Sequence, residues 1–468
     1  MELDPFDSIS IKTSSSLSQA IFKIMNNGDQ IPCLVATDSS SDRSYDDSMS
    51  VTSSNNDAMV AASSKYEDLV VEPHVGHKKV LVTGGAGFVG SSVAEALLAR
   101  GDDVVIVDEM NDYYDVTMKE SNLTRLQELY PQDGGRLSVY RGNICDMALM
   151  TSIFEKERPQ WICHMAARAG VRPSIDDPFI YIQSNIVGTT LLMELAHKYK
   201  VQNFVFASSS SVYGGSTSTY FSEDENVDNP VSPYAATKKA CELLAYTYHH
   251  LYKLNVSALR FFTVYGPRGR PDMAPYQFVD KISRGVEIQK FGDGSSSRDY
   301  TYISDIVDGV IRSIDRPYPY QVFNLGKGDG TSLNEFIGIV EKHTGMIAKV
   351  RQLPDQAGDV PYTCASVEKA RTLLGYEATV SFNEGIRRTV EWYNARKSTT
   401  VSTVGIMKAH VSKPLASSIR TSLFELTKKT CRPIQTAEDV DASTTKCCLS
   451  RCVSNDAIGA AKRMKISP

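Results

Sequence analysis

The stretch Lys79–Val–Leu–Val–Thr–Gly–Gly–Ala–Gly–Phe–Val–Gly90 decides how the rest of the chain folds. A short apolar run is followed by glycines three residues apart, at Gly84, Gly87 and Gly90, and then by the apolar spacing of a helix. Glycines in such a turn let backbone N–H groups approach a pyrophosphate at the positive end of the helix. The order of strand, glycine-rich turn and helix therefore predicts a dinucleotide-binding site.

A second apolar run supports this interpretation. Val104–Asp108 has the composition of a buried strand, and its last residue is an acid that lies 18 positions beyond Gly90. In dinucleotide-binding folds, an acid about 20 residues past the glycines accepts hydrogen bonds from the adenosine ribose. We therefore expect Asp108 to bind that ribose.

Strand and helix patterns alternate from Lys78 onward. Apolar strand patterns lie at 79–83, 104–108, 137–140, 160–165, 203–208 and 255–260, with helical patterns between them. Such alternation predicts an α/β fold, a doubly wound parallel sheet of Rossmann type with helices on both faces. The dinucleotide would lie across the carboxyl ends of the strands.

The remaining segments set the predicted domain limits. Residues 1–76 are rich in Ser and Asp, which is typical of a disordered arm. Residues 77–263 form the dinucleotide-binding domain. Shorter elements over 264–396 favour a smaller C-terminal α/β lobe that binds the substrate, with some segments returning to the first domain. Residues 399–468 form a basic Ser/Thr/Cys tail that we expect to be disordered.

Charge and cysteine content exclude several classes of function. A net charge of −5 offers no general attraction for nucleic acid, although the arm carries 12 acids and 4 bases and the tail 5 acids and 11 bases. Nine scattered cysteines are typical of reduced thiols, and their spacing predicts no metal site. No run approaches the ~18 apolar residues of a membrane span, and the first residues lack the basic and apolar regions of a signal peptide. We expect a cytoplasmic protein.

Polar clusters carry the candidate chemistry. Tyr234 and Lys238 are four residues apart at the start of a helical pattern, so they share one helix face. An ammonium group beside a phenol favours the phenolate, which can accept a hydroxyl proton near neutral pH. The serines of 208–211 end an apolar strand, where their hydroxyls can bond a reacting hydroxyl. His164–Arg172 ends another strand with small residues, and Arg172 is a candidate anion contact.

Together these motifs resemble the extended short-chain dehydrogenase/reductase superfamily, in particular its NAD-dependent nucleotide-sugar epimerases, and most closely UDP-glucuronate 4-epimerases. The resemblance covers about residues 77–396. The stretches that carry it are 83–90, 107–115, 166–172, 208–214, 234–238, 260–267, 269–274 and 298–302. The two tails lie outside it.

The resemblance implies a tightly held NAD and a UDP-sugar substrate. UDP-glucuronate would become UDP-galacturonate through a transient 4-keto sugar. Tyr234 would accept the C4 hydroxyl proton, Ser209 would take the position of the catalytic Ser/Thr, and Lys238 would orient the nicotinamide ribose. Tyr234 and Lys238 would thus also contact the cofactor, together with Gly84, Gly87, Phe88, Val89, Gly90, Asp108, Asn143, Ile144, Ala166 and Ala167. The substrate would contact Arg172, Asn185, Ser210, Ser211, Thr263, Arg270, Gln289, Phe291, Arg298 and Asp359.

A few positions favour one reaction within the superfamily. Ser210 and Ser211 stand where sugar 4,6-dehydratases carry Asp–Glu, so elimination would lack its acid and base. Galactose-type 4-epimerases resemble Arg–Tyr–Phe–Asn at the stretch that here is Arg260–Phe–Phe–Thr263, so Thr263 stands at the position of the Asn. These hydroxyls suit a C5 carboxylate, which needs hydrogen-bond donors. We hypothesise that neutral donors hold the carboxylate in an orientation unfavourable for loss of CO₂.

Other readings stay open on the sequence. A UDP-glucose or UDP-N-acetylhexosamine 4-epimerase, a UDP-glucuronate decarboxylase and an NAD-bound scaffold or regulator are the alternatives. Relatives often form homodimers through helices that here correspond to 178–199 and 232–253. The chain also departs from its relatives, because Arg268 stands where Trp is frequent, Ala357 where Pro is usual, and Asn143–Ile144 where an Asp is common.

Overall fold

The computed structural model of the protein describes residues 65–131, 134–354 and 362–411, with side chains up to residue 397. Residues 1–64 of the predicted arm and 412–468 of the predicted tail lie outside these described residues. Within the described part of the chain, no helix is both long enough and apolar enough to cross a lipid bilayer.

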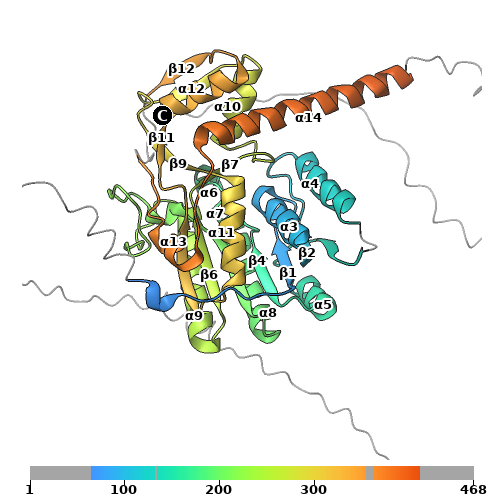
Figure 1. Ribbon diagram of the computed structural model, residues 1–468, viewed down its shortest axis with the longest axis vertical. Coiled ribbons are helices and arrows are strands. Elements are labelled where there is room, and N and C mark those ends of the chain that lie inside the picture. Colours follow the sequence, from blue (N-terminus) through green and yellow to red (C-terminus); the bar gives the residue numbers. More distant parts are fainter. Residues whose placement is uncertain (1–64, 132–133, 355–361, 412–468) are drawn as a thin grey trace, which may run out of the picture. The chain divides into compact units, whose positions relative to one another are not determined.

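A seven-stranded parallel sheet forms the centre of the domain (Figure 1). Its strands are β1 (Lys79–Thr83), β2 (Asp103–Asp108), β3 (Leu137–Arg141), β4 (Trp161–His164), β5 (Asn203–Ser209), β6 (Val256–Phe261) and β10 (Tyr320–Leu325). They lie in the order β10-β6-β5-β4-β1-β2-β3, and every neighbouring pair is parallel. The six strands predicted before residue 263 are present, and the predicted doubly wound sheet is confirmed.

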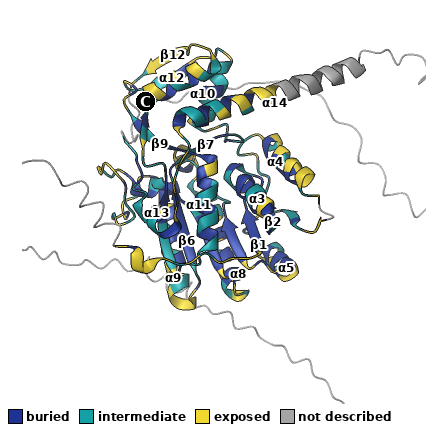
Figure 2. Cartoon of the chain, in the orientation of Figure 1, coloured by how far each residue is buried: buried dark blue, intermediate teal, exposed yellow. Residues whose placement is uncertain are grey.

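Helices cover both faces of this sheet. One face carries α3 (Phe88–Arg100), α4 (Val116–Leu129), α11 (Ile303–Asp315) and α13 (Glu368–Leu374), and the other carries α5 (Met147–Glu157), α8 (Gly188–Lys198) and α9 (Pro233–Tyr252). Val80 and Val82 belong to the first apolar core, whereas Leu81 between them belongs to the second. Because both faces are covered, the central strands β1, β2 and β4 are largely apolar and almost entirely buried, whereas the edge strands β3 and β10 are partly exposed (Figure 2).

A smaller group of elements follows β6. A three-stranded sheet contains β7 (Thr263–Tyr265), β9 (Ser297–Tyr302) and β11 (Gly330–Ser332), and a two-stranded sheet contains β8 (Ile288–Phe291) and β12 (Val350–Leu353). The helices are α10 (Ala274–Ser283), α12 (Leu333–Thr344) and α14 (Phe382–Val411). Stacked rings of Tyr300 and Phe382, 4.8 Å apart, lie in the core of this lobe beside Phe336.

Two later segments pack with the first sheet. β10 pairs with β6 along its whole length, and α11 packs against α3. The structure of this part of the chain extends beyond residues 77–396, the limits predicted from the sequence. Tyr66 is buried in the core, and the His74 N–H donates to the Asp315 carbonyl at 2.7 Å, so residues 65–76 already lie on the domain. At the other end, α14 continues to Val411.

The helix predicted over 178–199 is a composite. It consists of α7 (Pro178–Tyr181), the π-helical turn η3 (Ile182–Val187) and α8. Such π turns are rare and occur frequently at functional sites. Three further short helices are η1 (Glu67–Leu69), α6 (Val171–Asp176) and η4 (Ser210–Tyr213).

The strand order places a crevice between β1 and β4. The chain adds β2 and β3 on one side of β1 and then crosses to β4 on the other side. In open parallel sheets, ligands bind at the carboxyl ends of the two strands where the order reverses. Gly84 follows β1 and Met165 follows β4, so both glycine-turn and His164–Arg172 motifs begin at this crevice.

Candidate active site

A cavity of ≈ 400 Å³ opens at the carboxyl ends of the strands. All of the residues predicted for catalysis and for cofactor binding line it, and so do four of those predicted for the substrate, Ser210, Ser211, Thr263 and Arg270. These residues come from both lobes and from chain segments far apart in the sequence. The fold thus brings the separate motifs into one site.

The glycine turn is shaped by close backbone approach. A Cβ atom on Gly84 would lie 2.7 Å from the Ala166 backbone nitrogen, and one on Gly90 would collide with the Gly84 carbonyl oxygen. Gly84 also has a φ of 66°, which residues with side chains rarely adopt. These two positions therefore require glycine, and β1, α3 and the end of β4 meet more closely than side chains would allow.

Helix α3 points its amino terminus at the cavity. Its cap residue, Gly87, offers no side-chain acceptor to the first N–H groups of the helix, which leaves them available for an anion. Nearby, the Asp108 carboxylate accepts hydrogen bonds from the backbone N–H of Ala86 at 3.1 Å and of Met110 at 2.9 Å. The first N–H groups of α3 can therefore donate to a phosphate group. The Asp108 carboxylate at the end of β2 is held in a fixed orientation and can accept further hydrogen bonds.

Helix α9 positions the tyrosine and the lysine. Its cap, Ser232, accepts a hydrogen bond from the Ala235 N–H, and the Tyr234 N–H donates to the Ser174 hydroxyl at 3.1 Å. One turn further on, the Lys238 ammonium donates to the Ala207 carbonyl oxygen on β5 at 2.7 Å. Tyr234 and Lys238 are buried but still line the cavity, beside Ser209 at the end of β5.

A buried ion pair underlies this group. The Glu242 carboxylate, one helical turn beyond Lys238, accepts two hydrogen bonds from the Arg260 guanidinium at 2.9 and 2.8 Å and one from the Ser208 hydroxyl at 2.6 Å. Burial disfavours the charged form of Arg260, but Glu242 outweighs it and raises the pKa of Arg260. The pair joins β5, β6 and α9 directly beneath Ser209.

His164 joins three elements behind the crevice. Its Nδ1 lies 2.6 Å from the Thr83 hydroxyl oxygen at the end of β1, and its Nε2 lies 2.9 Å from the Thr189 hydroxyl oxygen on α8. Burial, with a smaller contribution from the Lys238 charge, lowers the pKa of His164 to about 3. The ring is therefore neutral at physiological pH and serves as a hydrogen-bonded brace.

Three hydroxyl groups that were predicted to contact the substrate line the cavity. The Ser209 hydroxyl donates to the Ser211 hydroxyl at 3.0 Å and accepts from the Ser211 N–H at 3.2 Å, so the turn after β5 is tightly organised. Thr263 is the first residue of β7, which pairs with β9 of the smaller lobe. Thr263 lines the same cavity as Ser210 and Ser211. These are neutral donors on two different lobes.

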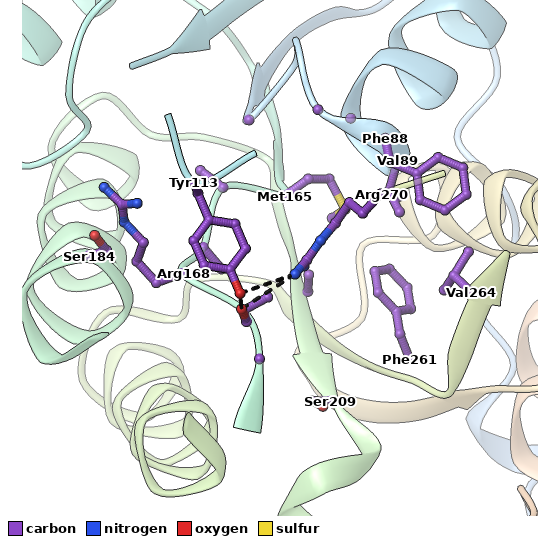
Figure 3. Close-up of a pocket in the computed structure, with 18 of the residues that line it drawn as sticks. Phe88, Val89, Tyr113, Met165, Arg168, Ser184, Ser209, Phe261, Val264 and Arg270 are labelled. Atoms are coloured by element: carbon purple, nitrogen blue, oxygen red, sulfur yellow. Dashed lines mark hydrogen bonds between the residues drawn. The ribbon is translucent and has the colours of Figure 1, made fainter. Parts of the chain in front are cut away.

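A second wall of the cavity is built from loops (Figure 3). The Tyr113 hydroxyl donates to the Ala169 carbonyl oxygen at 2.6 Å, and the Arg270 guanidinium lies 3.5 Å from both oxygens and 5.2 Å from the centre of the Tyr113 ring. Arg270 is also ion-paired with Asp272 at 2.5 Å. Figure 3 shows Arg270 extending across the cavity towards Tyr113.

Several predicted substrate contacts do not line the cavity. Asn185 is buried on η3, where its amide bonds the Arg168 N–H and carbonyl and the Thr237 hydroxyl, so it ties the loop after β4 to α9. Arg172 is the second residue of α6, Gln289 and Phe291 lie on β8, and Arg298 lies on β9. Asp359 and the departure at Ala357 lie outside the described residues.

The structure adds residues to the cavity that the sequence motifs missed. They include Glu109, Tyr113, Lys119, Arg168, Ser184, Phe261, Val264 and Met273. Glu109 directly follows Asp108, so its position at the end of a predicted strand could have identified it as a site residue. Its carboxylate pairs with the Arg168 guanidinium at 3.0 Å, on the next loop. Tyr113 lies within the stretch 107–115 that carries the resemblance, although it was not predicted as a site residue. Ser184 lies outside every such stretch and reaches the cavity through tertiary contacts.

Fold and site together define a dinucleotide-dependent enzyme of the short-chain dehydrogenase/reductase class. The chain belongs to the family described as GDP-mannose 4,6 dehydratase, whose model matches residues 81–389. The predicted resemblance to NAD-dependent nucleotide-sugar epimerases is also confirmed, because the similar proteins below carry that activity in their names.

Two curated relatives and one solved structure illustrate the similarity. The UDP-glucuronate 4-epimerase of Thermodesulfobacterium geofontis is 47% identical over 313 residues, covering 67% of this chain and 95% of that protein. The probable UDP-glucuronate 4-epimerase of Rhizobium meliloti is 40% identical over 345 residues, covering 69% and 100%. The UDP-glucuronic acid 4-epimerase of Bacillus cereus, solved with UDP-glucuronic acid and NAD, matches with a TM-score of 0.63 at 34% identity, covering 68% and 99%.

Proposed function

We propose that this protein is an NAD-dependent 4-epimerase that converts UDP-glucuronate into UDP-galacturonate through a transient 4-keto sugar. The observation that carries the proposal is a single cavity that combines the glycine turn, the Ser209–Tyr234–Lys238 group and the hydroxyls of Ser210, Ser211 and Thr263. The first set suits a dinucleotide, the second suits oxidation of a carbinol, and the third suits a carboxylate on the sugar.

The residues of the crevice fit NAD. Gly84 and Gly90 let the turn, α3 and the end of β4 pack closely, and the first N–H groups of α3 would be the donors to the pyrophosphate. The Asp108 carboxylate would accept hydrogen bonds from the ribose hydroxyls, with Glu109 and its partner Arg168 beside it. Phe88, Val89, Asn143, Ile144, Ala166 and Ala167 complete the cofactor's surroundings. Bound NAD supplies the hydride acceptor and donor for C4 of the sugar.

Three side chains perform the proton chemistry. Tyr234 takes the proton of the C4 hydroxyl during oxidation and returns it during reduction, so it ends the cycle in its starting state. Ser209 bonds the same oxygen and keeps it aligned with Tyr234. Lys238, fixed by the Ala207 carbonyl, supplies the positive charge that stabilises the phenolate and orients the nicotinamide ribose.

Substrate choice rests on the hydroxyls and on Arg270. The hydroxyls of Ser210, Ser211 and Thr263 donate to the C5 carboxylate and hold it away from the orientation that releases CO₂ from a β-keto acid. Arg270 provides a charge-assisted contact to the diphosphate. Arg172, Asn185, Gln289, Phe291, Arg298 and Asp359 stay predictions for the rest of the UDP-sugar. In this proposal, residues 77–263 bind NAD and residues 264–396 bind UDP.

A panel of UDP-sugars tests the function directly. Purified full-length protein is incubated with UDP-glucuronate, UDP-glucose or UDP-N-acetylglucosamine without added NAD, and products are identified by chromatography and NMR. We expect UDP-galacturonate from UDP-glucuronate and little turnover of the neutral sugars. Release of CO₂ with formation of UDP-xylose, or preferential turnover of UDP-glucose, would contradict the proposal.

The assembly and the location are part of the same proposal. Exposed apolar side chains lie on α9 (Leu243, Tyr246, Leu251) and on α7 (Phe179), which supports a homodimer through the two predicted helices. Leu243→Glu should then convert a dimer into a monomer in analytical ultracentrifugation. Cys145, Cys163, Cys241 and Cys364 are free thiols, which supports a cytoplasmic location.

A further inference from the structure

The turn that leads into Arg270 has an unusual residue at its third position. The Gly269 N–H donates to the Gly266 carbonyl oxygen at 3.0 Å, and Pro267 occupies the second position, which defines a type II turn. Such a turn needs a positive φ at its third residue and normally places glycine there. Here that residue is Arg268, with a φ of 68°. A conformation that is unfavourable for a residue with a Cβ must be offset by some other contact.

An ion pair between the two lobes provides that contact. The Arg268 guanidinium lies 2.8 Å from the carboxylate of Glu95, which is on α3 of the dinucleotide-binding domain. The same carboxylate pairs with Arg125 of α4 at 2.7 Å. The two arginines differ in burial, because the side chain of Arg268 is 20% exposed and that of Arg125 is 55% exposed. The Arg268 pair is therefore less screened by salt than the Arg125 pair, although burial costs desolvation and lowers the pKa of Arg268. Of the two arginines, Arg268 is the one that links α3 to the turn 266–269.

The segment after the turn connects this contact to the cavity. Arg270 follows Arg268 by two residues and extends into the cavity towards Tyr113 and Ala169. The Met273 N–H then donates to the Arg270 carbonyl at 3.2 Å, just before α10 begins. The segment 266–273 is therefore held by α10 at one end and by Arg268 at the other, with Arg270 between them.

We propose that Arg268 is a positioning residue, whose ion pair with Glu95 fixes the turn 266–269 against α3 and thereby sets where Arg270 meets the substrate. The inference rests on the proposed function, which assigns Arg270 to the anionic part of a UDP-sugar. It also gives a role to a residue that the sequence analysis noted only as a departure from relatives.

Matched variants separate this role from general stability. Arg268→Asn removes the ion pair but keeps a residue that tolerates positive φ, so the turn itself is preserved. Glu95→Gln removes the charge from α3 and leaves the sequence of the turn unchanged. Arg125→Ala removes the other partner of Glu95 and is the control. Each full-length variant is studied by hydrogen–deuterium exchange of residues 266–273 and by steady-state kinetics with UDP-glucuronate.

We expect Arg268→Asn and Glu95→Gln to speed exchange in 266–273 and to raise KM about tenfold with kcat within about twofold, because a misplaced binding group weakens the substrate contact. Arg125→Ala should match the wild type. In an Arg270→Ala background, Arg268→Asn should change kcat/KM less than twofold, since its effect passes through Arg270. Unchanged exchange, unchanged KM or additive losses would each overturn the proposal.

Failure of the proposed function gives a different pattern. If no UDP-sugar is turned over by the wild type, the enzyme assignment is wrong. The exchange measurement still judges the Arg268 contact, because it requires no substrate. Slower exchange in wild type than in Arg268→Asn would then retain the ion pair as an anchor of the turn and remove only its link to substrate binding.

Discussion

The two walls of the cavity are built by different means. The sheet wall carries Ser209, Tyr234 and Lys238 on a strand end and a helix, and regular secondary structure fixes the backbone of each. The loop wall carries Tyr113 and Arg270, which belong to no helix or strand and are held by side-chain contacts with each other, Ala169 and Asp272. Chemistry on rigid elements and recognition on loops is a common division in enzymes. Substitutions in the sheet wall should therefore lower mainly kcat, and substitutions in the loop wall should raise mainly KM.

The strongest test of the sheet wall is Tyr234→Phe. Loss of the phenol removes the proton acceptor and should lower kcat about 10³-fold, with KM and NAD content little changed. Turnover is measured with UDP-glucuronate, and cofactor content by absorbance after denaturation. A variant that epimerises at the wild-type rate would remove Tyr234 from the mechanism.

The glycine turn tests the tight packing on the same wall. Gly90→Ala places a methyl group against the Gly84 carbonyl and should destabilise the fold by about 1–3 kcal/mol and release NAD. Gly338→Ala is the control, because its Cβ would meet no atom within 4 Å and it lies in α12. That change should stabilise by about 0.5–1 kcal/mol. Urea unfolding of both variants shows whether the loss of stability comes from the clash with the Gly84 carbonyl or from replacing any helical glycine.

Thr263 tests the boundary between the two walls. Thr263→Ala removes one hydrogen-bond donor to the proposed carboxylate, which should lower kcat/KM for UDP-glucuronate by about 10–100-fold, equivalent to ~1.5–3 kcal/mol. Turnover of UDP-glucose should change much less, so the preference for glucuronate falls. An unchanged preference in a competition assay would exclude Thr263 from carboxylate recognition.

The pH dependence of stability tests the brace behind the sheet wall. Because the pKa of His164 is about 3 in the folded protein and about 6.5 in an unfolded chain, the folded state binds fewer protons. The stabilisation is complete above pH 6.5 and is lost as the pH falls towards 3, by up to about 1.4 kcal/mol per pH unit. Urea unfolding at pH 7, 6 and 5 should show this slope, and His164→Gln should lack it.

The smallest effect is expected on the loop wall. Tyr113→Phe removes the hydroxyl that bonds Ala169 and lies near Arg270, at a cost of about 1 kcal/mol. We expect KM for UDP-glucuronate to rise about fivefold with kcat unchanged. If kcat fell instead, as for Tyr234→Phe, the contrast between the two walls would not hold.

The same contrast explains which elements and site residues could be predicted from the sequence alone. Apolar runs and glycine spacing identify β1, β2 and α3 because those signals are local, and the strand ends then bring Asp108 and Ser209 to one edge. Asn185 shows where this fails, since its partners, Arg168 and Thr237, are chosen by tertiary packing. Tyr113, on the loop after β2, and Ser184, on η3, line the cavity only because chain segments far apart in the sequence meet there. No periodicity carries that information.

The membership of β10 in the first sheet has a consequence for biosynthesis. Strand β6 is complete at Phe261, but its outer neighbour begins only at Tyr320, after much of the smaller lobe. At synthesis rates of about 5–20 residues per second, a nascent chain exposes the apolar edge of β6 for several seconds. An open strand edge of that kind invites pairing with other chains. The seven-stranded sheet is therefore completed late in translation, and a chain released after residue 263 would be a candidate for chaperone capture.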